Sequence, residues 1–307
     1  MKTPLRALSV IALILIFAGC GTVDTFKGAL AGNPSDIANA AETVKQGGEV
    51  AGKVVQANKD FSPEEEYYIG RTVAATILTM YKPWDGPKAN EYLNTLGLSL
   101  ALAAVPPNPY NGYHFLIMDT DDINAFGAPS GFVLVSRGLL RCATSEDEVA
   151  SILAHEIGHV SLKHGMSAIS SARRTDALLA IAKFIASNSG VGALSDLTAS
   201  FGGVIGDIVK KMVSSGYSRD QEKQADLEAI RILHDVGYDP KALVRVLTVM
   251  KTKLKPDGKD FAKTHPAPDT RIAYLNDAIK AQAATPAATP AQVKSRQTRY
   301  LAALQKI

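Results

Sequence analysis

The sequence predicts an α+β fold that is mostly helical, with a small β-sheet flanking one central helix. Several segments carry apolar residues at helical period behind capping residues, as Ser145 and Glu148 do before a helix expected from about Glu146. Only two runs, 113–118 and 131–136, have strand composition, and both precede that helix. The chain has 307 residues, 46% of them hydrophobic and 21% charged, which is an ordinary globular composition.

The first twenty residues have the features of a targeting segment. Two basic residues precede an apolar run at 7–17, which is too short for a comfortable membrane span. The Ala-Gly-Cys sequence that ends at Cys20 resembles a bacterial lipobox, which implies that 1–19 is a lipoprotein signal peptide and that Cys20 is lipidated. Gly21 rather than aspartate follows, and in that family this favours the outer membrane. An ordinary secretory peptide is the alternative, and either segment implies export.

Charge and cysteine content narrow the function classes. The formal charge is +3, and without the basic residues Lys2 and Arg6 the count is 31 basic against 30 acidic residues. The chain therefore lacks the excess of basic residues that is typical of nucleic-acid-binding proteins. With Cys20 lipidated, Cys142 has no cysteine left to pair with, and we expect it to be a small buried hydrophobe.

The segments before the central helix are expected to serve as a tether and a scaffold. Residues 20–60 are rich in Ala, Gly, Val and Lys and predict a tether. Ser62 and Pro63 open the folded body as N-cap and first helical residue. A second helix is expected over 89–104, and the segment 124–131 between the two strand runs is expected to be a turn-rich loop.

Beyond the central helix the sequence predicts more helices. Residues 175–213 indicate a helical hairpin, either more core or a mobile or membrane-facing insertion beside the cleft. Ser218 and Gln221 form a capping box for the next helix. Residues 282–307 are expected to be a linker and a peripheral C-terminal helix. The remaining helices are expected over 218–234, 240–253 and 271–281.

The central helix carries the H-E-x-x-H sequence, from His155 through Glu156 to His159. Residues four apart lie on one face of a helix, so both rings can reach one metal ion. Glu156 can then reach a water on that ion and act as the general base of amide hydrolysis. The alternative is a pair of ordinary helix histidines with a chance glutamate between them.

A catalytic zinc site needs a third protein ligand. His164 follows His155 by two and a half turns and is expected to point off the site face as a surface or helix-terminal charge. His234 lies three turns along the next predicted helix, too far to share the metal. The candidates that remain are Glu222, Asp226 and His265.

Residues 222–226 resemble the E-x-x-A-D element of the M48 zinc metallopeptidases. The segments 124–126, 132–139, 146–164 and 265–271 resemble that family in order and spacing, so the resemblance covers about 60 to 281. It implies a zincin-type peptidase domain over 61–281 that binds one zinc ion per subunit. By the resemblance, His155, His159 and Glu222 are the metal ligands, Glu156 activates the water, and Asp226 accepts a proton from a ligand imidazole.

Three further features each have two expected roles. In related enzymes the histidine that corresponds to His265 lies near the metal, so His265 is expected either to hydrogen-bond the tetrahedral intermediate or to plug the open position. Arg271 is expected to stabilise the oxyanion or to form a structural salt bridge. The strand 132–135 is a candidate edge for pairing with an extended peptide, or a plain core strand.

The expected function is a lipid-anchored zinc endopeptidase that faces the periplasm from the inner leaflet of the outer membrane. Its expected substrates are misfolded or unassembled envelope proteins, and outer-membrane assembly machinery is a candidate partner. The alternative is a chaperone-like protein that binds unfolded peptides, with its metal capped by His265 and little turnover. No nucleic-acid partner is expected.

Overall fold

A computed structural model describes the folded body of the chain. The predicted signal peptide with Cys20, the tether apart from Ser35, and the predicted hairpin apart from 209–210 lie outside the described residues. Two compact units divide the chain, and one of them, 61–168 with 205–307, holds every element named below. Within the described residues no helix combines the length and the apolar character needed to cross a membrane. The described residues are 35, 61–106, 108–171, 209–210, 216–253, 265, 267–282 and 288–307.

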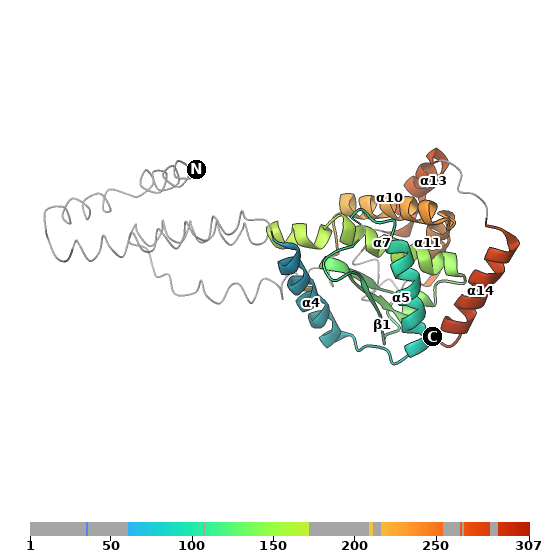
Figure 1. Ribbon diagram of the computed structural model, residues 1–307. Helices are drawn as coiled ribbons and strands as arrows, with labels where there is room; N and C mark the ends of the chain where they lie inside the picture. Colours follow the sequence, from blue (N-terminus) through green and yellow to red (C-terminus); the bar gives the residue numbers. More distant parts are fainter. Residues whose placement is uncertain are drawn as a thin grey trace. The chain divides into compact units, whose positions relative to one another are not determined.

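Helices dominate this unit, which confirms the predicted mostly helical class with a small sheet (Figure 1). The elements in chain order are α4 Pro63–Met80, α5 Pro87–Ala101, β1 His114–Met118, β2 Ala125–Ala128, the 3-10 turn η1 Pro129–Gly131, β3 Phe132–Ser136, α6 Arg137–Leu140, α7 Glu146–Ser161, α10 Arg219–Val236, α11 Lys241–Lys253, α13 Pro268–Ala281 and α14 Pro290–Leu304.

The sheet has three strands in the order β1-β3-β2. β1 pairs with β3 in parallel, His114 opposite Phe132, and β2 pairs with β3 antiparallel, Ala125 opposite Val135. One sequence-based expectation was wrong here, because the expected loop contains strand β2. Of the two roles expected for 132–135, the structure contradicts the substrate-pairing edge and agrees with the core strand, because β3 is central and paired on both sides.

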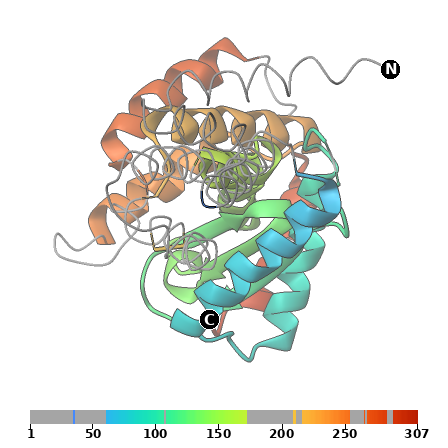
Figure 2. The same ribbon diagram turned by 90° about the vertical axis from the view of Figure 1, so that its left-hand side faces the viewer.

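Each face of the sheet is covered by helices. Side chains alternate along β3, so Val133 and Val135 join the core formed with α5 and α7. The opposite face meets α4, whose Gly70 lies so close to η1 that a Cβ would come 1.9 Å from the Pro129 carbonyl oxygen. Figure 2 shows α4 (blue) beside the strands. The sheet is therefore fixed on both sides, and its edge strand β2 lies next to α7.

Helix α7 is buried over almost all of its length because α5, α10, α11 and the sheet surround it (Figure 1). Its Ser145 hydroxyl accepts from the Glu148 amide, as the capping pattern predicted. Gly158 faces Ala225 of α10, and a Cβ on Gly158 would lie 2.9 Å from the Ala225 carbonyl oxygen. Two small residues thus let α7 and α10 approach closely at the point where both carry ionisable side chains.

The C-terminal helix that the sequence predicted is α14, and most of its residues are exposed or half-buried. Helix α14 packs on α5 and α7, and its Leu304 is buried. Arg299 contacts the buried Glu146 carboxylate at 2.5 Å, and Arg296 contacts Asp147 at 3.1 Å. Both acidic groups lie in the first turn of α7, where the positive end of the helix dipole also favours them. Helix α14 thus stabilises the N-terminal end of the central helix.

Candidate metal centre

Helices α7 and α10 bring His155, His159 and Glu222 together. The Nε2 atoms of the two histidines lie 3.2 Å apart. Oε2 of Glu222 is 3.6 Å from Nε2 of His155, and Oε1 is 3.4 Å from Nε2 of His159. With His265 these residues form a buried group whose donor atoms all lie within 4.8 Å of one another.

The donor set fits a zinc ion. Two imidazole Nε2 atoms and a carboxylate converge on one point, and Oε1 of Glu222 is buried with no hydrogen-bond partner among the described residues. A buried carboxylate oxygen without a donor is costly unless a cation faces it. His₂Glu is also a donor set found in catalytic zinc sites.

Asp226 and Arg271 lie behind His155. Oδ1 of Asp226 lies 3.0 Å from Nδ1 of His155, and Nη2 of Arg271 lies 3.3 Å from the same nitrogen. Arg271 is 1% exposed and donates to both oxygens of Asp226, from Nη2 at 2.6 Å and from Nε at 2.9 Å. Tyr274 also donates to Asp226 through a short hydrogen bond. The guanidinium of Arg271 therefore binds the carboxylate, and its Nη1 stands 4.0 Å from Oε2 of Glu222.

His265 lies on the site. Its Nδ1 is 2.8 Å from Oε2 of Glu222, and its ring centroid is 5.4 Å from that of His155 and 5.9 Å from that of His159. The ring is buried and faces the same carboxylate as the other two histidines. The neighbouring Pro266 lies outside the described residues.

His164 is not the surface residue that the sequence predicted. It is 3% exposed, and its Nδ1 lies 2.9 Å from Nδ1 of His159. The expectation assumed that the helix continues, but α7 ends at Ser161 and Lys163 adopts a left-handed φ of 55°. The chain turns back there, so residue 164 returns to the site face. Its Nε2 then meets the Gln224 side-chain oxygen at 3.1 Å.

Glu156 projects into a small space between α7 and the edge strand β2. Its Oε2 is buried and has no hydrogen-bond partner in the described part of the chain. A Cβ on Gly127 of β2 would lie 2.7 Å from the Glu156 carbonyl oxygen and 3.2 Å from Oε2, so only glycine fits there. The space has a volume of about 10 Å³, and Tyr217 and His265 complete its walls. Such a volume is enough for about one water molecule.

Tyr217 is a site residue that the sequence reasoning missed. Its ring stacks on His159 with centroids 4.3 Å apart, and its hydroxyl donates to the Gly127 carbonyl at 3.1 Å. Tyr217 directly precedes Ser218, whose hydroxyl caps α10, so the cap holds the ring in place. The one available signal was an aromatic residue immediately before a strong helix start, within five residues of Glu222.

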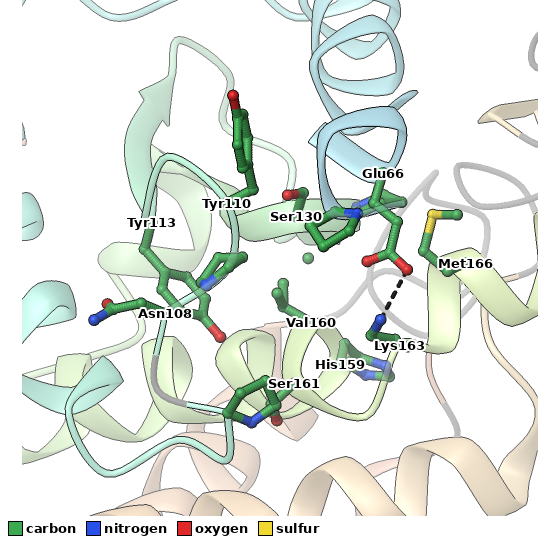
Figure 3. Close-up of a pocket in the computed structure, with 16 residues that line it drawn as sticks. Glu66, Asn108, Tyr110, Tyr113, Ser130, His159, Val160, Ser161, Lys163 and Met166 are labelled. Atoms are coloured by element: carbon green, nitrogen blue, oxygen red, sulfur yellow. Dashed lines mark hydrogen bonds and ion pairs between the residues drawn. The ribbon is translucent and has the colours of Figure 1, made fainter. Parts of the chain in front are cut away.

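A larger cavity of about 140 Å³ adjoins the site on the other side of Gly127 (Figure 3). His159 and Gly127 line both this cavity and the metal-centre region. Lys163 and Glu66 form an ion pair of 2.7 Å at the cavity, drawn as a dashed line in Figure 3.

The site shifts the pKa values of its ionisable groups in opposite directions. Burial and Arg271 oppose protonation of His155, but hydrogen bonds to Asp226 and Glu222 outweigh them and raise its pKa to about 9. Burial lowers the pKa of His159 to about 4. Burial raises the pKa of Glu156, whereas the histidines around Glu222 outweigh its burial and hold its pKa well below the ordinary value. One carboxyl thus favours holding a proton and the other favours staying charged.

The chain is similar to known peptidases. The model of "Peptidase family M48" matches residues 87–279. The chain is 26% identical over 243 residues to the beta-barrel assembly-enhancing protease of Escherichia coli K12, covering 77% of this chain and 47% of that protein. It is 32% identical over 197 residues to a putative beta-barrel assembly-enhancing protease of Vibrio cholerae (61% and 38% covered). It is 27% identical over 197 residues to the metalloprotease LoiP of E. coli K12 (64% and 73% covered). The chain spans about half the length of the first of these relatives.

Proposed function

The chain belongs to peptidase family M48, and we propose that it is a zinc-dependent endopeptidase that cleaves misfolded or unassembled proteins of the cell envelope. The family match confirms the resemblance on which the site was predicted. One observation carries the proposal: three buried donors converge beside Glu156, a carboxylate whose Oε2 no described residue binds.

In the proposal His155, His159 and Glu222 hold one zinc ion per subunit. When bound, such an ion polarises the carbonyl of the peptide bond and acidifies a water at the open position. Asp226 lies 3.0 Å from Nδ1 of His155, and in the proposal it accepts the Nδ1 proton and so leaves Nε2 free to bind metal. Arg271 in turn holds Asp226 in place through two hydrogen bonds.

In the proposal Glu156 transfers a proton from the attacking water to the leaving amine. Its Oε2 faces the space that admits about one water, and it takes a proton from the attacking water and passes it to the leaving amine. Burial raises the pKa of Glu156, so the carboxyl can hold this proton between the two steps. The walls of the space exclude bulk water, which strengthens each electrostatic interaction inside it.

The substrate chain is proposed to pair with β2. Strand β3 is internal to the sheet, whereas β2 has one edge free of strand partners among the described residues and passes directly over Glu156. An extended peptide there gains backbone hydrogen bonds with little sequence preference, as a protease of unfolded chains requires. Tyr217 already binds the Gly127 carbonyl, so the peptide must displace it.

His265 has two proposed roles that its position supports equally. Its contact with Glu222 places it at the open side of the donor set, where it caps the site at rest. Once displaced from Glu222, the same ring is near enough to hydrogen-bond the tetrahedral intermediate. Capping is also the observation that favours the second candidate function, a chaperone-like peptide-binding protein with little turnover.

Location and partners are proposed from the N-terminal sequence and from the relatives. We propose that Cys20 carries a lipid anchor and that residues 1–19 are removed as a lipoprotein signal peptide. The anchor places the enzyme on the inner leaflet of the outer membrane. The name of the E. coli relative refers to beta-barrel assembly, which supports assembly machinery as a partner. Mass spectrometry of the N-terminal peptide from membranes tests the lipid, and an unmodified Cys20 would refute it.

Bound metal and casein cleavage test the enzyme. Residues 21–307 are purified, zinc is measured, and cleavage is compared with that of Glu156→Gln. We expect about one zinc per chain in both proteins and cleavage only in the wild type. Zinc without turnover in either protein supports the peptide-binding alternative, and a lack of stoichiometric metal refutes both. His265→Ala then separates the roles of His265, because cleavage rises if His265 caps the site and falls if it assists catalysis.

A further inference from the structure

The 140 Å³ cavity beside the metal centre has the size of a single side chain (Figure 3). A cavity of about 150 Å³ engineered in another protein binds benzene, so this volume admits a leucine, methionine or phenylalanine side chain. Buried apolar groups of Tyr113, Val160 and Met166 line it, together with several prolines.

Its charged groups are already paired. Glu66 and Lys163 neutralise each other at 2.7 Å, so neither is left to attract a charged side chain of a ligand. An apolar side chain can fill the cavity without leaving a charge uncompensated, whereas a carboxylate or ammonium would lose its hydration.

The cavity lies beside the proposed path of the substrate. Gly127 of β2 lines both this cavity and the small space at Glu156, and Pro129, two residues farther along, also lines the cavity. Because a strand rises about 3.3 Å per residue, the cavity lies about two residues from the catalytic carboxylate along a paired peptide. We propose that this cavity receives one large apolar side chain of the substrate, close to the bond that is cut. This proposal rests on the proposed function.

Filling the cavity tests this site. Ser161 lines it at the end of α7, and Ser161→Phe occupies the space. Ser99→Phe is the matched control, because Ser99 is also a helical serine bonded to a carbonyl one turn back, but it is exposed on α5. Tyr110→Ala, at a residue 44% exposed, widens the cavity from its outer side and serves as a second variant.

The measurement is kcat/KM on peptides that carry Ala, Leu, Phe or Glu at each position around the cleaved bond. At one position the wild type and Ser99→Phe should prefer Leu or Phe over Ala and Glu by about 10-fold or more. Ser161→Phe should reduce this ratio to about 2-fold, and Tyr110→Ala should extend the preference to Trp. A wild type with no such preference, or a ratio unchanged in Ser161→Phe, overturns the proposal.

A binding measurement separates this proposal from the proposed function. If the wild type cleaves none of the peptides, the endopeptidase proposal fails, but the cavity is still tested by NMR titration with N-acetyl-phenylalaninamide. Shifts at cavity residues in the wild type that are absent in Ser161→Phe support the side-chain site. An absence of shifts in the wild type refutes it.

An independent observation concerns the hydrogen bonds behind His159. Only one proton fits between Nδ1 of His159 and Nδ1 of His164, which lie 2.9 Å apart. For Nε2 of His159 to offer a lone pair to a metal, that proton belongs to His159. A neutral His164 then carries its own proton on Nε2, where the Gln224 oxygen accepts it at 3.1 Å. Each donor in this chain meets an acceptor.

We infer that His164 and Gln224 are positioning residues that fix the metal-binding tautomer of His159, as Asp226 does for His155. The inference rests on the proposed metal site. The contact behind His159 differs from the one behind His155, because its partner is the imidazole of His164 and not a carboxylate. No further carboxylate is therefore placed next to Glu222.

Zinc affinity measured by chelator competition tests the inference. His164→Leu removes the acceptor and should weaken zinc binding by about 10- to 100-fold. His164→Asn places an amide oxygen near the lost Nδ1 and should restore most of the affinity. Gln224 is exposed, so Gln224→Leu should fold normally and show a smaller loss. His234→Leu, at a histidine remote from the centre, should bind as the wild type does.

Circular dichroism and thermal unfolding show whether each variant folds. Equal affinity of His164→Leu and the wild type refutes the inference, and so does equal weakening in the Leu and Asn variants, which indicates a purely structural side chain. A wild type that binds no zinc refutes both this inference and the proposed function. A zinc-binding wild type with an unaffected His164→Leu refutes the inference alone.

Discussion

Arg271 and Asp226 form a fully buried pair in which the guanidinium donates to both oxygens of the carboxylate. The Asp226 carboxylate also lies 3.0 Å from Nδ1 of His155, so the pair lies between the α13 helix and the candidate metal ligands. Because both partners are charged and buried, removal of Arg271 leaves the buried carboxylate with Tyr274 and His155 but without its cationic partner.

Arg271→Met should lower the free energy of unfolding by about 3–5 kcal/mol, the usual effect of breaking a buried ion pair from one side. Urea unfolding monitored by circular dichroism measures it. Arg141→Met, which removes an exposed pair with Asp121, is the control and should change stability by less than about 1 kcal/mol. A loss for Arg271→Met as small as that of the control would contradict the structural role.

Gly127→Ala should impair catalysis. Its Cβ would lie 2.7 Å from the Glu156 carbonyl oxygen, so β2 must move away from α7. We expect kcat/KM to fall by about 10-fold or more, since misplacement of about 1 Å can cost 100-fold. Gly237→Ala, in a left-handed turn with open space around it, should lower stability but leave kcat/KM unchanged.

Tyr217→Phe should raise cleavage of unfolded substrates. The ring still stacks on His159, but the hydrogen bond to the Gly127 carbonyl is lost, and the edge of β2 becomes easier to pair with. Such a bond contributes about 0.5–1.5 kcal/mol, so kcat/KM should rise by about 2- to 10-fold. Tyr300→Phe loses a comparable bond to the Ala143 carbonyl and should not change kcat/KM. A marked fall in Tyr217→Phe would instead assign the hydroxyl to the chemistry.

Stability should fall above about pH 10, in part because of Tyr238. Burial and the nearby Glu146 raise its pKa above the ordinary 10.0, so the folded state favours the neutral phenol. The contribution is therefore complete below pH 10 and is lost as the pH rises through the shifted pKa, by up to about 1.4 kcal/mol per pH unit. Tyr238→Phe should be about 1 kcal/mol less stable at pH 8, and the gap should narrow by pH 11 in urea unfolding. A constant gap would contradict the shift.

Capping residues predicted the central helices well because their effect is local. Ser145 and Ser218 each accept from the amide three residues later, as expected, and they fix the starts of α7 and α10. The sequence did not predict strand β2 because residues 125–128, Ala-Phe-Gly-Ala, have little intrinsic preference for strands. It is a strand because β3 pairs with it and because Gly127 allows contact with α7.

The positions of His164 and Tyr217 could not be read from spacing. His164 lies on the site face because a single left-handed residue, Lys163, reverses the chain, and lysine gives no local sign of that conformation. Tyr217 meets His159 only because α7 and α10 pack together, which depends on Gly158 and Ala225.

The turn at Lys163 has a consequence for protein design. A helix that carries only His155, Glu156 and His159, transplanted onto another scaffold, would leave behind the imidazole that contacts His159. The transferable unit runs from the cap at Ser145 through His164, with its non-helical residue kept in place. Grafts of the five-residue pattern and of the twenty-residue unit would differ in how firmly the second histidine is oriented before any metal arrives.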